Sequence, residues 1–135
     1  HYRKMMNAFR YDPESTAADA ITAAARQVAQ TISASVIVTF SSTGSTTLRC
    51  ARERPSVPLL SLTPRADTAR KMSMAWGVHS VLTEDLNTFP DMVVKATNVA
   101  KSEGFGDVGD PLVITAGVPF GTPGATNILR IAWVD

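Results

Sequence analysis

One five-residue run constrains the fold of this 135-residue chain more than any other feature. The run VIVTF at 36–40 is too short for an ordinary helix, and it is apolar on both faces, as a central strand of a parallel sheet is. Short apolar runs recur at 58–62, 78–82 and 112–116, and a last one occupies 127–134. The sequence therefore predicts five strands.

Helical patterns fill three of the intervals between these runs and the segment before the first. Over 14–31 apolar residues recur at spacings of three and four, with Thr16 and Asp19 placed as a capping pair, so an amphipathic helix is expected. The other expected helices are a short one over 47–53 closed by Pro55, one capped by Thr63 with Pro64 in its first turn and ending near Gly77, and one opened by Thr88 and Asp91 and ended by Gly104.

Strands that alternate with helices predict an α/β fold, here a three-layer α/β/α sandwich with a five-stranded mixed sheet of order 3-2-1-4-5. The connection over 117–126 has no helical pattern, whereas parallel neighbours need a crossover of about a dozen residues. The last strand is therefore expected to run antiparallel to the fourth. A chain of this length has room for one such domain.

Composition and charge exclude several classes of protein. Thirteen basic and twelve acidic side chains leave a formal charge of +1 without any run of like charge, so no nucleic-acid partner is expected. No apolar stretch approaches the roughly 20 residues that span a bilayer, so no membrane partner is expected either. The chain has one cysteine, Cys50, and two histidines, His1 and His79. These residues give neither an internal disulfide nor a metal cluster, which fits a cytoplasmic setting.

The polar segment that follows the first expected strand is the leading candidate site. Ligands of open α/β sheets bind beyond the carboxyl ends of the strands. A glycine there lets the backbone approach an anion, the first amides of the following helix point outward, and hydroxyls donate further hydrogen bonds. This chemistry favours a phosphate group. The expected phosphate-binding residues are Ser41, Ser42, Thr43, Gly44, Ser45 and Thr46.

A second loop of small residues leaves the fourth expected strand at the same edge of the sheet. For the first loop, at 41–46, an alternative interpretation stays open: its hydroxyls only cap a helix and fill a turn. This loop has neither the lysine of a Walker sequence nor the glycine spacing of a dinucleotide-binding sequence. The expected residues of the second effector loop are Gly117, Pro119, Gly121, Thr122, Pro123, Gly124 and Thr126.

The remaining reactive side chains form no catalytic or metal-binding set in the sequence. His79 has no titratable partner nearby in the sequence, Cys50 has no base beside it, and the adjacent pair Glu84 and Asp85 is typical of a loop. A cluster beside the first loop could steer an anion but is more typical of a solvated face: Arg49, Arg52, Glu53 and Arg54.

Several stretches, taken together in their order and spacing, resemble the C-terminal domain of pyruvate kinase over nearly the whole chain. They are TAADAI at 16–21, AAARQVA at 23–29, STGST at 42–46, ARERP at 51–55, PLLSLT at 58–63, GD at 109–110, TAGVP at 115–119 and GTPGATN at 121–127.

The resemblance implies a regulatory domain of a glycolytic enzyme, with 14–135 as the effector-binding domain and 1–13 as the remnant of a segment joining it to a catalytic barrel domain. In that family phosphate passes from phosphoenolpyruvate to ADP in the barrel, with magnesium and potassium ions, so no cofactor and no catalytic residue is expected here. The resemblance also implies a cytoplasmic homotetramer in which the strand at 127–134 lies near a subunit contact.

The resemblance further implies a phosphorylated effector. In family members that respond to a sugar phosphate, the loop matching 41–46 wraps the phosphate and the loop matching 117–126 closes over the ligand. The leading contacts carried over are Ser41, Thr43, Gly44 and Thr46. Animal enzymes activated by fructose bisphosphate place arginines at Ser45 and near Met92, so we expect a sugar monophosphate or AMP instead.

Three other functions stay open at this point. The chain could be a free-standing phosphate- or nucleotide-binding module with no allosteric partner, a phosphate-transferring or nucleotide-hydrolysing enzyme, or a scaffold that only mediates oligomer contacts.

Overall fold

A computed structural model describes residues 13–117 and 128–135 of the chain, with side chains from Ala17 onward in the first range. The strands are β1 (Ile37–Phe40), β2 (Leu59–Thr63), β3 (Val78–Leu82), β4 (Pro111–Ala116) and β5 (Ile128–Trp133). They form one sheet in the order β3-β2-β1-β4-β5, in which β5 pairs antiparallel with β4 and the other neighbours are parallel. This confirms the predicted fold class, strand order and reversal of the last strand.

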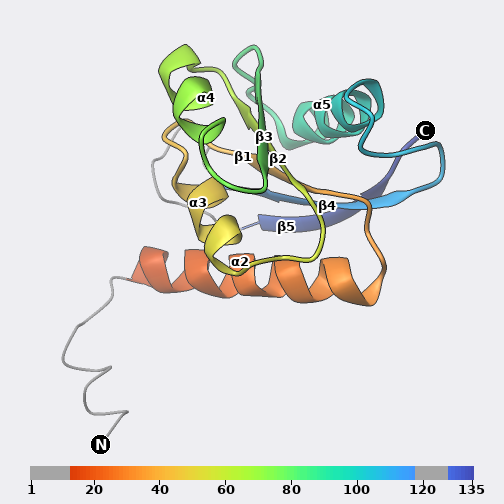
Figure 1. The fold of residues 1–135 in the computed structure, drawn as a ribbon, viewed down its shortest axis with the longest axis horizontal. Helices are drawn as coiled ribbons and strands as arrows, with labels where there is room; N and C mark the ends of the chain where they lie inside the picture. Colours follow the sequence, from red (N-terminus) through yellow and green to blue (C-terminus); the bar gives the residue numbers. More distant parts are fainter. Residues whose placement is uncertain (1–12, 118–127) are drawn as a thin grey trace, which may run out of the picture.

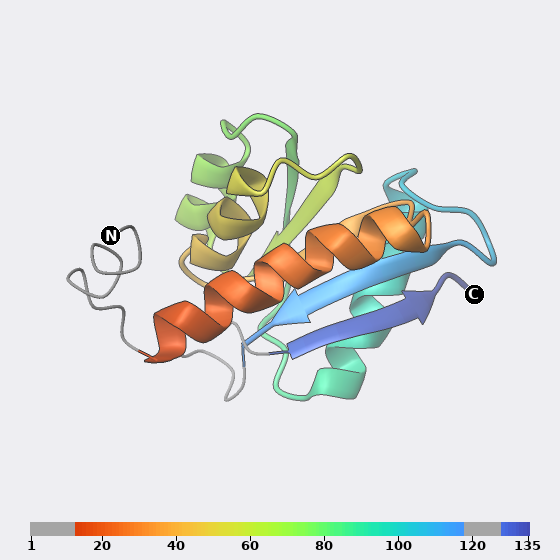
Figure 2. The same cartoon turned by 90° about the horizontal axis from the view of Figure 1, so that it is seen from below.

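The described helices cover both faces of this sheet. They are α2 (Pro13–Thr31), α3 (Ser45–Arg52), α4 (Ala66–Met72) and α5 (Phe89–Ser102). Helices α2, α3 and α4 lie on one face and α5 on the other, which makes three layers (Figure 1). Figure 2 shows α2 lying along β4 and β5, with α5 behind them. Over the described ranges, no helix has the length and apolarity to cross a bilayer.

The hydrophobic core consists of two clusters, one on each face of the sheet, and β1 contributes to both. The sheet register places Ile37 beside Leu59 and Val113, and these side chains pack together under α2 and α3. Alternate residues point to the opposite face, because successive side chains in a strand do so. Since β1 is covered on both faces, all four of its residues are buried, as the VIVTF run predicts. The cluster under α5 includes Val38, Leu60, Ile114, Met92 and Ala96.

The start of α2 differs from the prediction. The helix begins at Pro13, three residues before Thr16, so Thr16 and Asp19 do not form the predicted capping pair. Proline at the first helical position has a preset φ and lacks an N–H that would need a partner. The Asp19 carboxylate instead accepts a hydrogen bond from the Arg49 guanidinium at 2.8 Å, which ties α2 to α3.

The bounds of α4 also differ, whereas the start of α5 is confirmed. Thr63 is the last residue of β2 rather than a helix cap, and α4 ends at Met72, well before Gly77. At α5 the Thr88 side chain accepts a hydrogen bond from the Asp91 N–H at 3.3 Å, as the capping pattern predicts.

Cys50 of α3 lies in the cluster beneath α2 and is 1% exposed. Burial raises the pKa of its thiol from the ordinary 9.0 to about 12, because the thiolate would lose its hydration. The Thr115 side chain opposes this rise, and the negative charge of Glu53 adds to it. The thiol is therefore an inert core group, as the sequence suggests.

We expect this buried thiol to make stability fall at alkaline pH. Because the folded-state pKa is raised, its contribution is fully present below pH 9.0 and is lost as the pH rises toward 12. The stability difference between the wild type and Cys50→Ala should shrink by about 1 kcal/mol from pH 8 to pH 10. Urea unfolding at both pH values measures this difference, and parallel pH profiles for the two proteins would contradict it.

Candidate functional site

The predicted phosphate-binding loop leaves the centre of the sheet at its carboxyl edge. β1 ends at Phe40, and the Ser41 N–H donates to the Leu62 carbonyl at 3.2 Å, which continues the ladder for one residue. Helix α3 begins at Ser45, two residues earlier than the predicted start at 47. Ser45 and Thr46 therefore stand in the first turn of the helix, where backbone N–H groups lack intrahelical partners.

Gly44 gives the loop its sharp turn. Its φ is +91°, a left-handed conformation that glycine adopts without strain. A Cβ built on Gly44 would lie 2.7 Å from Met72 Cε and 2.9 Å from Met72 Sδ. Met72 is completely buried, so the end of its side chain has no solvent to move into. The chain at this point is held close to α4, and only glycine fits without displacing its neighbour.

The loop hydroxyls bond to one another and to nearby amides. Ser41 Oγ accepts the Gly44 N–H at 2.8 Å, which leaves the Ser41 O–H to donate elsewhere. Thr43 Oγ1 lies 3.3 Å from Ser45 Oγ and accepts the Ser45 N–H at 3.4 Å. The N-cap residue of α3 is Gly44, which has no side chain of its own to accept a hydrogen bond from the helix amides. Thr43 is exposed and Ser45 is half-buried, so both hydroxyls can be reached from outside.

Two threonines that the sequence analysis did not single out hold the loop in place. Thr68 Oγ1 of α4 donates to the Ser42 carbonyl at 2.8 Å. Thr47 Oγ1 lies 2.7 Å from Thr39 Oγ1 of β1 and 2.8 Å from Ser61 Oγ of β2, in a buried chain of hydroxyls. Thr39 and Ser61, polar residues inside otherwise apolar strands, were a signal for these hydrogen bonds, but their partner in α3 is set by the three-dimensional register.

The start of α4 brings charged side chains near the loop. The Arg65 guanidinium lies 3.0 Å from the Asp67 carboxylate. This hydrogen bond and the Thr68 N–H lower the pKa of Asp67, although both charged side chains are exposed. Arg65 is therefore paired with the carboxylate of a near neighbour in the chain.

Of the second predicted loop, the structure describes only its first residue. The register places Thr115 beside Thr39, so Gly117 follows β4 at the level where Ser41 follows β1. The two segments thus start at neighbouring positions on one edge. The other predicted residues of this loop lie outside the described residues: Pro119, Gly121, Thr122, Pro123, Gly124 and Thr126.

The other reactive side chains are engaged in surface pairs. His79 Nε2 lies 2.6 Å from Glu103 Oε1, and its ring packs at 5.2 Å from Phe105. The pKa of Glu84 is lowered by a hydrogen bond from its own backbone amide and by Lys95, at 3.0 Å. In 13–117 and 128–135 no three His, Cys, Asp or Glu side chains are grouped so as to hold a metal ion.

These features define an open, doubly wound α/β domain, the class in which the carboxyl edge of the sheet is the usual ligand position. Comparison with known proteins gives a narrower assignment. The sequence model of the family described as "Pyruvate kinase, alpha/beta domain" matches residues 19–132. The chain belongs to that family, which confirms the resemblance.

Similar proteins cover nearly all of this chain, but the chain covers little of them. A pyruvate kinase of Methylorubrum extorquens is 47% identical over 98% of this chain and 28% of its own length. One of Agrobacterium vitis is 38% identical over 96% of this chain and 27% of its own. A crystal structure of a Cryptosporidium parvum pyruvate kinase has the same fold, with a TM-score of 0.78 at 24% identity, covering 87% of this chain and 23% of that one. The chain thus spans about a quarter of the length of these relatives.

We expect Gly44→Ala to destabilise the domain more than Gly77→Ala does. Both glycines have positive φ, so both substitutions carry left-handed strain of roughly 1–2 kcal/mol. Only at Gly44 does the new methyl group meet a buried side chain, and this overlap should add about 1 kcal/mol or more. Denaturant unfolding measures both variants, and equal losses would show that Met72 does not constrain the loop.

We expect Thr47→Val to cost about 1–3 kcal/mol, because it removes two buried hydrogen bonds and leaves the Thr39 and Ser61 hydroxyls without that partner. Thr97→Val is the matched control, since the Thr97 hydroxyl is also buried in a helix but bonds only to the Val94 carbonyl. Thermal unfolding should show the smaller loss for the control. A smaller loss for Thr47→Val would mean that the hydroxyl chain does not anchor α3.

Proposed function

We propose that this chain is the regulatory domain of a cytoplasmic pyruvate kinase and that the loop at 41–46 binds the phosphate group of a small effector. The observation that carries the proposal is the turn at Gly44. It packs against Met72 and sets exposed hydroxyls beside the first turn of α3, beyond the end of the central strand. Backbone amides at a helix start, together with hydroxyl donors, favour an anion of the size of phosphate.

The chemistry of the loop supports a phosphate ligand over a carboxylate or a cation. The Ser41 O–H is available as a donor because Ser41 Oγ accepts the Gly44 N–H, and the Ser45 O–H is available because Ser45 Oγ accepts the Thr43 hydroxyl at 3.3 Å. The positive end of the α3 dipole points toward this region. A phosphate has enough acceptor oxygens to use several such donors at once, whereas a cation would be repelled.

A single phosphate is favoured over two. The segment 41–46 contains no lysine or arginine, and Arg49, one turn into α3, pairs with Asp19 at 2.8 Å. Met92, near the position at which the animal-type enzyme has a second arginine, is only 6% exposed in the core under α5. The effector that fits is a pentose phosphate, a hexose monophosphate or AMP rather than fructose bisphosphate.

The parent enzyme would transfer phosphate from phosphoenolpyruvate to ADP in the part of its chain that lies outside this domain, with the magnesium and potassium ions of the family. Effector binding would act there through coupling of about 1–3 kcal/mol, a change of 5- to 150-fold in substrate affinity. The exposed edge of β5, where Trp133 is 60% exposed, would contribute to subunit contacts in a homotetramer.

A thermal-shift panel tests the effector site. We expect ribose 5-phosphate, glucose 6-phosphate or AMP to raise the melting temperature of the 135-residue chain, because a ligand at 100 times its Kd stabilises the folded state by about 2.7 kcal/mol. Thr43→Glu should abolish the shift by placing a carboxylate among the loop donors. Asn98→Glu, which adds the same charge on exposed α5, should leave the shift intact.

Two outcomes would contradict the proposal. A flat panel would favour a domain that serves only subunit contacts. A shift with fructose bisphosphate far larger than with any monophosphate would show that the domain supplies a second cationic subsite that the loop lacks.

A further inference from the structure

Helix α4 has an inward face that differs from that of an ordinary surface helix. Of its seven residues only Thr68 and Met72 are buried, at 6% and 0% exposed. They are four positions apart and therefore point to the same side of the helix. A surface helix usually turns a stripe of several apolar side chains toward the core. Among the described residues, neither of the two core clusters includes Met72.

Both buried residues of α4 contact the candidate phosphate loop. In the first turn of the helix, Thr68 Oγ1 donates to the Ser42 carbonyl at 2.8 Å. At the last residue of the helix, Met72 lies so close to Gly44 that a Cβ built on the glycine would be 2.7 Å from Met72 Cε. The two contacts hold the segment 42–44 from one side. The buried face of α4 is therefore tied to the loop at both of its ends.

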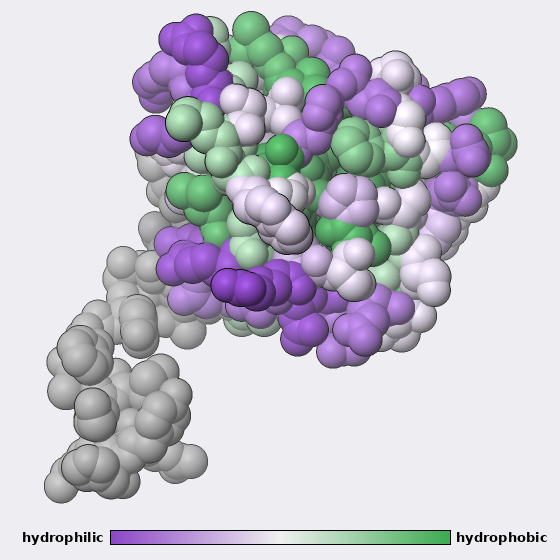
Figure 3. All heavy atoms as spheres, viewed as in Figure 1, coloured by the Kyte–Doolittle hydropathy of each residue, from purple (hydrophilic) through white to green (hydrophobic). Residues whose placement is uncertain are grey.

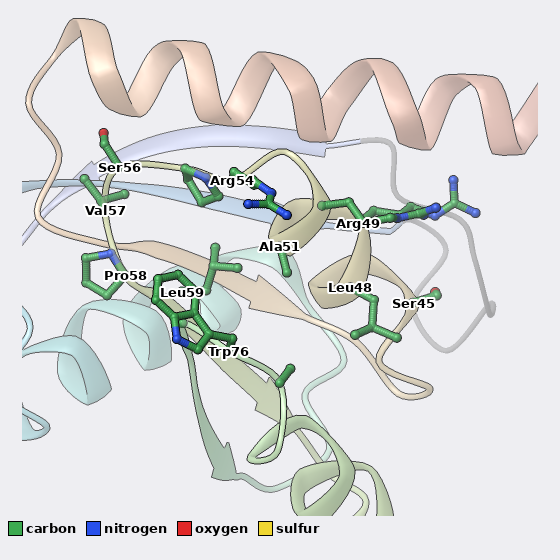
Figure 4. Close-up of a pocket in the computed structure, with 14 residues that line it drawn as sticks. Ser45, Leu48, Arg49, Ala51, Arg54, Ser56, Val57, Pro58, Leu59 and Trp76 are labelled. Carbon is green, nitrogen blue, oxygen red and sulfur yellow. The ribbon is translucent and has the colours of Figure 1, made fainter.

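The surroundings of α4 leave space beside it. The helix packs on β2 and on β3, which is an edge strand of the sheet. Between α3 and the turn that follows α4 lies an open groove of about 1220 Å³. Figure 4 shows its labelled side chains extending from Trp76 at one end to Leu48 and Ser45 at the other. In the space-filling view, apolar residues lie at the surface beside α3 and are bordered by hydrophilic ones (Figure 3). The turn after α4 therefore has room to shift relative to α3.

A displacement of α4 would reach the surface at this turn, which covers residues 73–77. The Ala75 N–H donates to the Met72 carbonyl at 3.0 Å, and the Val78 N–H donates to the Ala75 carbonyl at 3.3 Å. Within the turn, Met74 is 88% exposed and Trp76 is 96% exposed. Because the backbone of the turn is bonded to the end of α4 and these side chains are exposed, the turn would follow the helix.

We propose that Thr68 and Met72 are positioning residues of the phosphate loop and that α4 is the element through which the domain responds to its effector. The inference rests on the proposed function, because it takes the loop at 41–46 as the site of a phosphate group. A phosphate that draws the Gly44 amide toward itself shifts the segment that the two residues hold, and α4 follows with its turn. By reciprocity, whatever restrains α4 changes the affinity for the phosphate.

The hydrogen bond from Thr68 sets this affinity by ordering the loop before the ligand arrives. Without it, the backbone at Ser42 has more conformations open to it, and binding must then restrict them. The observed affinity falls in proportion to the fraction of molecules whose loop has the binding conformation. Thr68 acts on the ligand only through the loop backbone, so its contribution is one of position.

Calorimetric titration of the 135-residue chain with AMP and with ribose 5-phosphate tests the positioning role. Thr68→Val should weaken binding about tenfold, because one buried hydrogen bond no longer fixes the bound loop. Thr68→Ser retains the hydroxyl and should restore the wild-type affinity. Thr97→Val is the matched control, since the Thr97 hydroxyl is 8% exposed and bonds within α5, and it should leave the affinity unchanged.

Amide chemical shifts at saturating AMP test the response of α4 and need no variant. In the wild type, shifts at Gly44 and Ser45 should be accompanied by shifts over 68–72 and 73–77, while α5 stays unchanged. In Thr68→Val the loop amides should still shift at saturation, but the shifts over 68–77 should shrink.

The outcomes separate this inference from the proposed function. If neither AMP nor ribose 5-phosphate binds the wild type, the proposed function fails and the inference falls with it. If the ligand binds and shifts the loop amides while α4 stays unchanged, only the inference is overturned. A Thr68→Val affinity equal to that of the wild type would also overturn it, as would an equal loss in Thr97→Val, which would assign the effect to general destabilisation.

Discussion

The candidate site depends on the position of β1 at the centre of the sheet. β1 is paired with parallel strands on both sides, so its backbone has no free edge. The chain therefore leaves β1 at the middle of the carboxyl edge of the sheet. Within four residues it then reverses to bring α3 back over the sheet. Gly44 makes this reversal possible, because it adopts the left-handed backbone conformation without strain. It also has no side chain to overlap with the buried Met72 side chain. The reversal at Gly44 fixes the positions of the loop hydroxyls and of the first residues of α3.

Helix α3 connects the features that bear on function. Its start holds the Ser45 hydroxyl, and its buried side is fixed to β1 and β2 by Thr47. The pair of Arg49 with Asp19 links it to α2 as well.

The strands and their order were predictable because hydrophobic periodicity and the lengths of connections are local properties of the sequence. Helix starts were less so: α2 begins at Pro13 rather than at a Thr16 cap, and α4 is much shorter than its pattern suggested. The polar segment after β1 was expected at 41–46, but Ser45 and Thr46 stand in the first turn of α3, and the threonines that hold the segment in place were missed. The contacts of Thr47 with Ser61 and of Thr68 with the Ser42 carbonyl join residues 14 and 26 positions apart, and only the folded register brings them together.

The most direct test of the central claim, that the turn at Gly44 forms a phosphate site, is an NMR titration of the 135-residue chain with AMP or ribose 5-phosphate. The account expects the largest amide shifts at Gly44, Ser45 and Thr46, with saturation, and little change in α5. Amide shifts that saturate elsewhere and leave these three residues unchanged would contradict it.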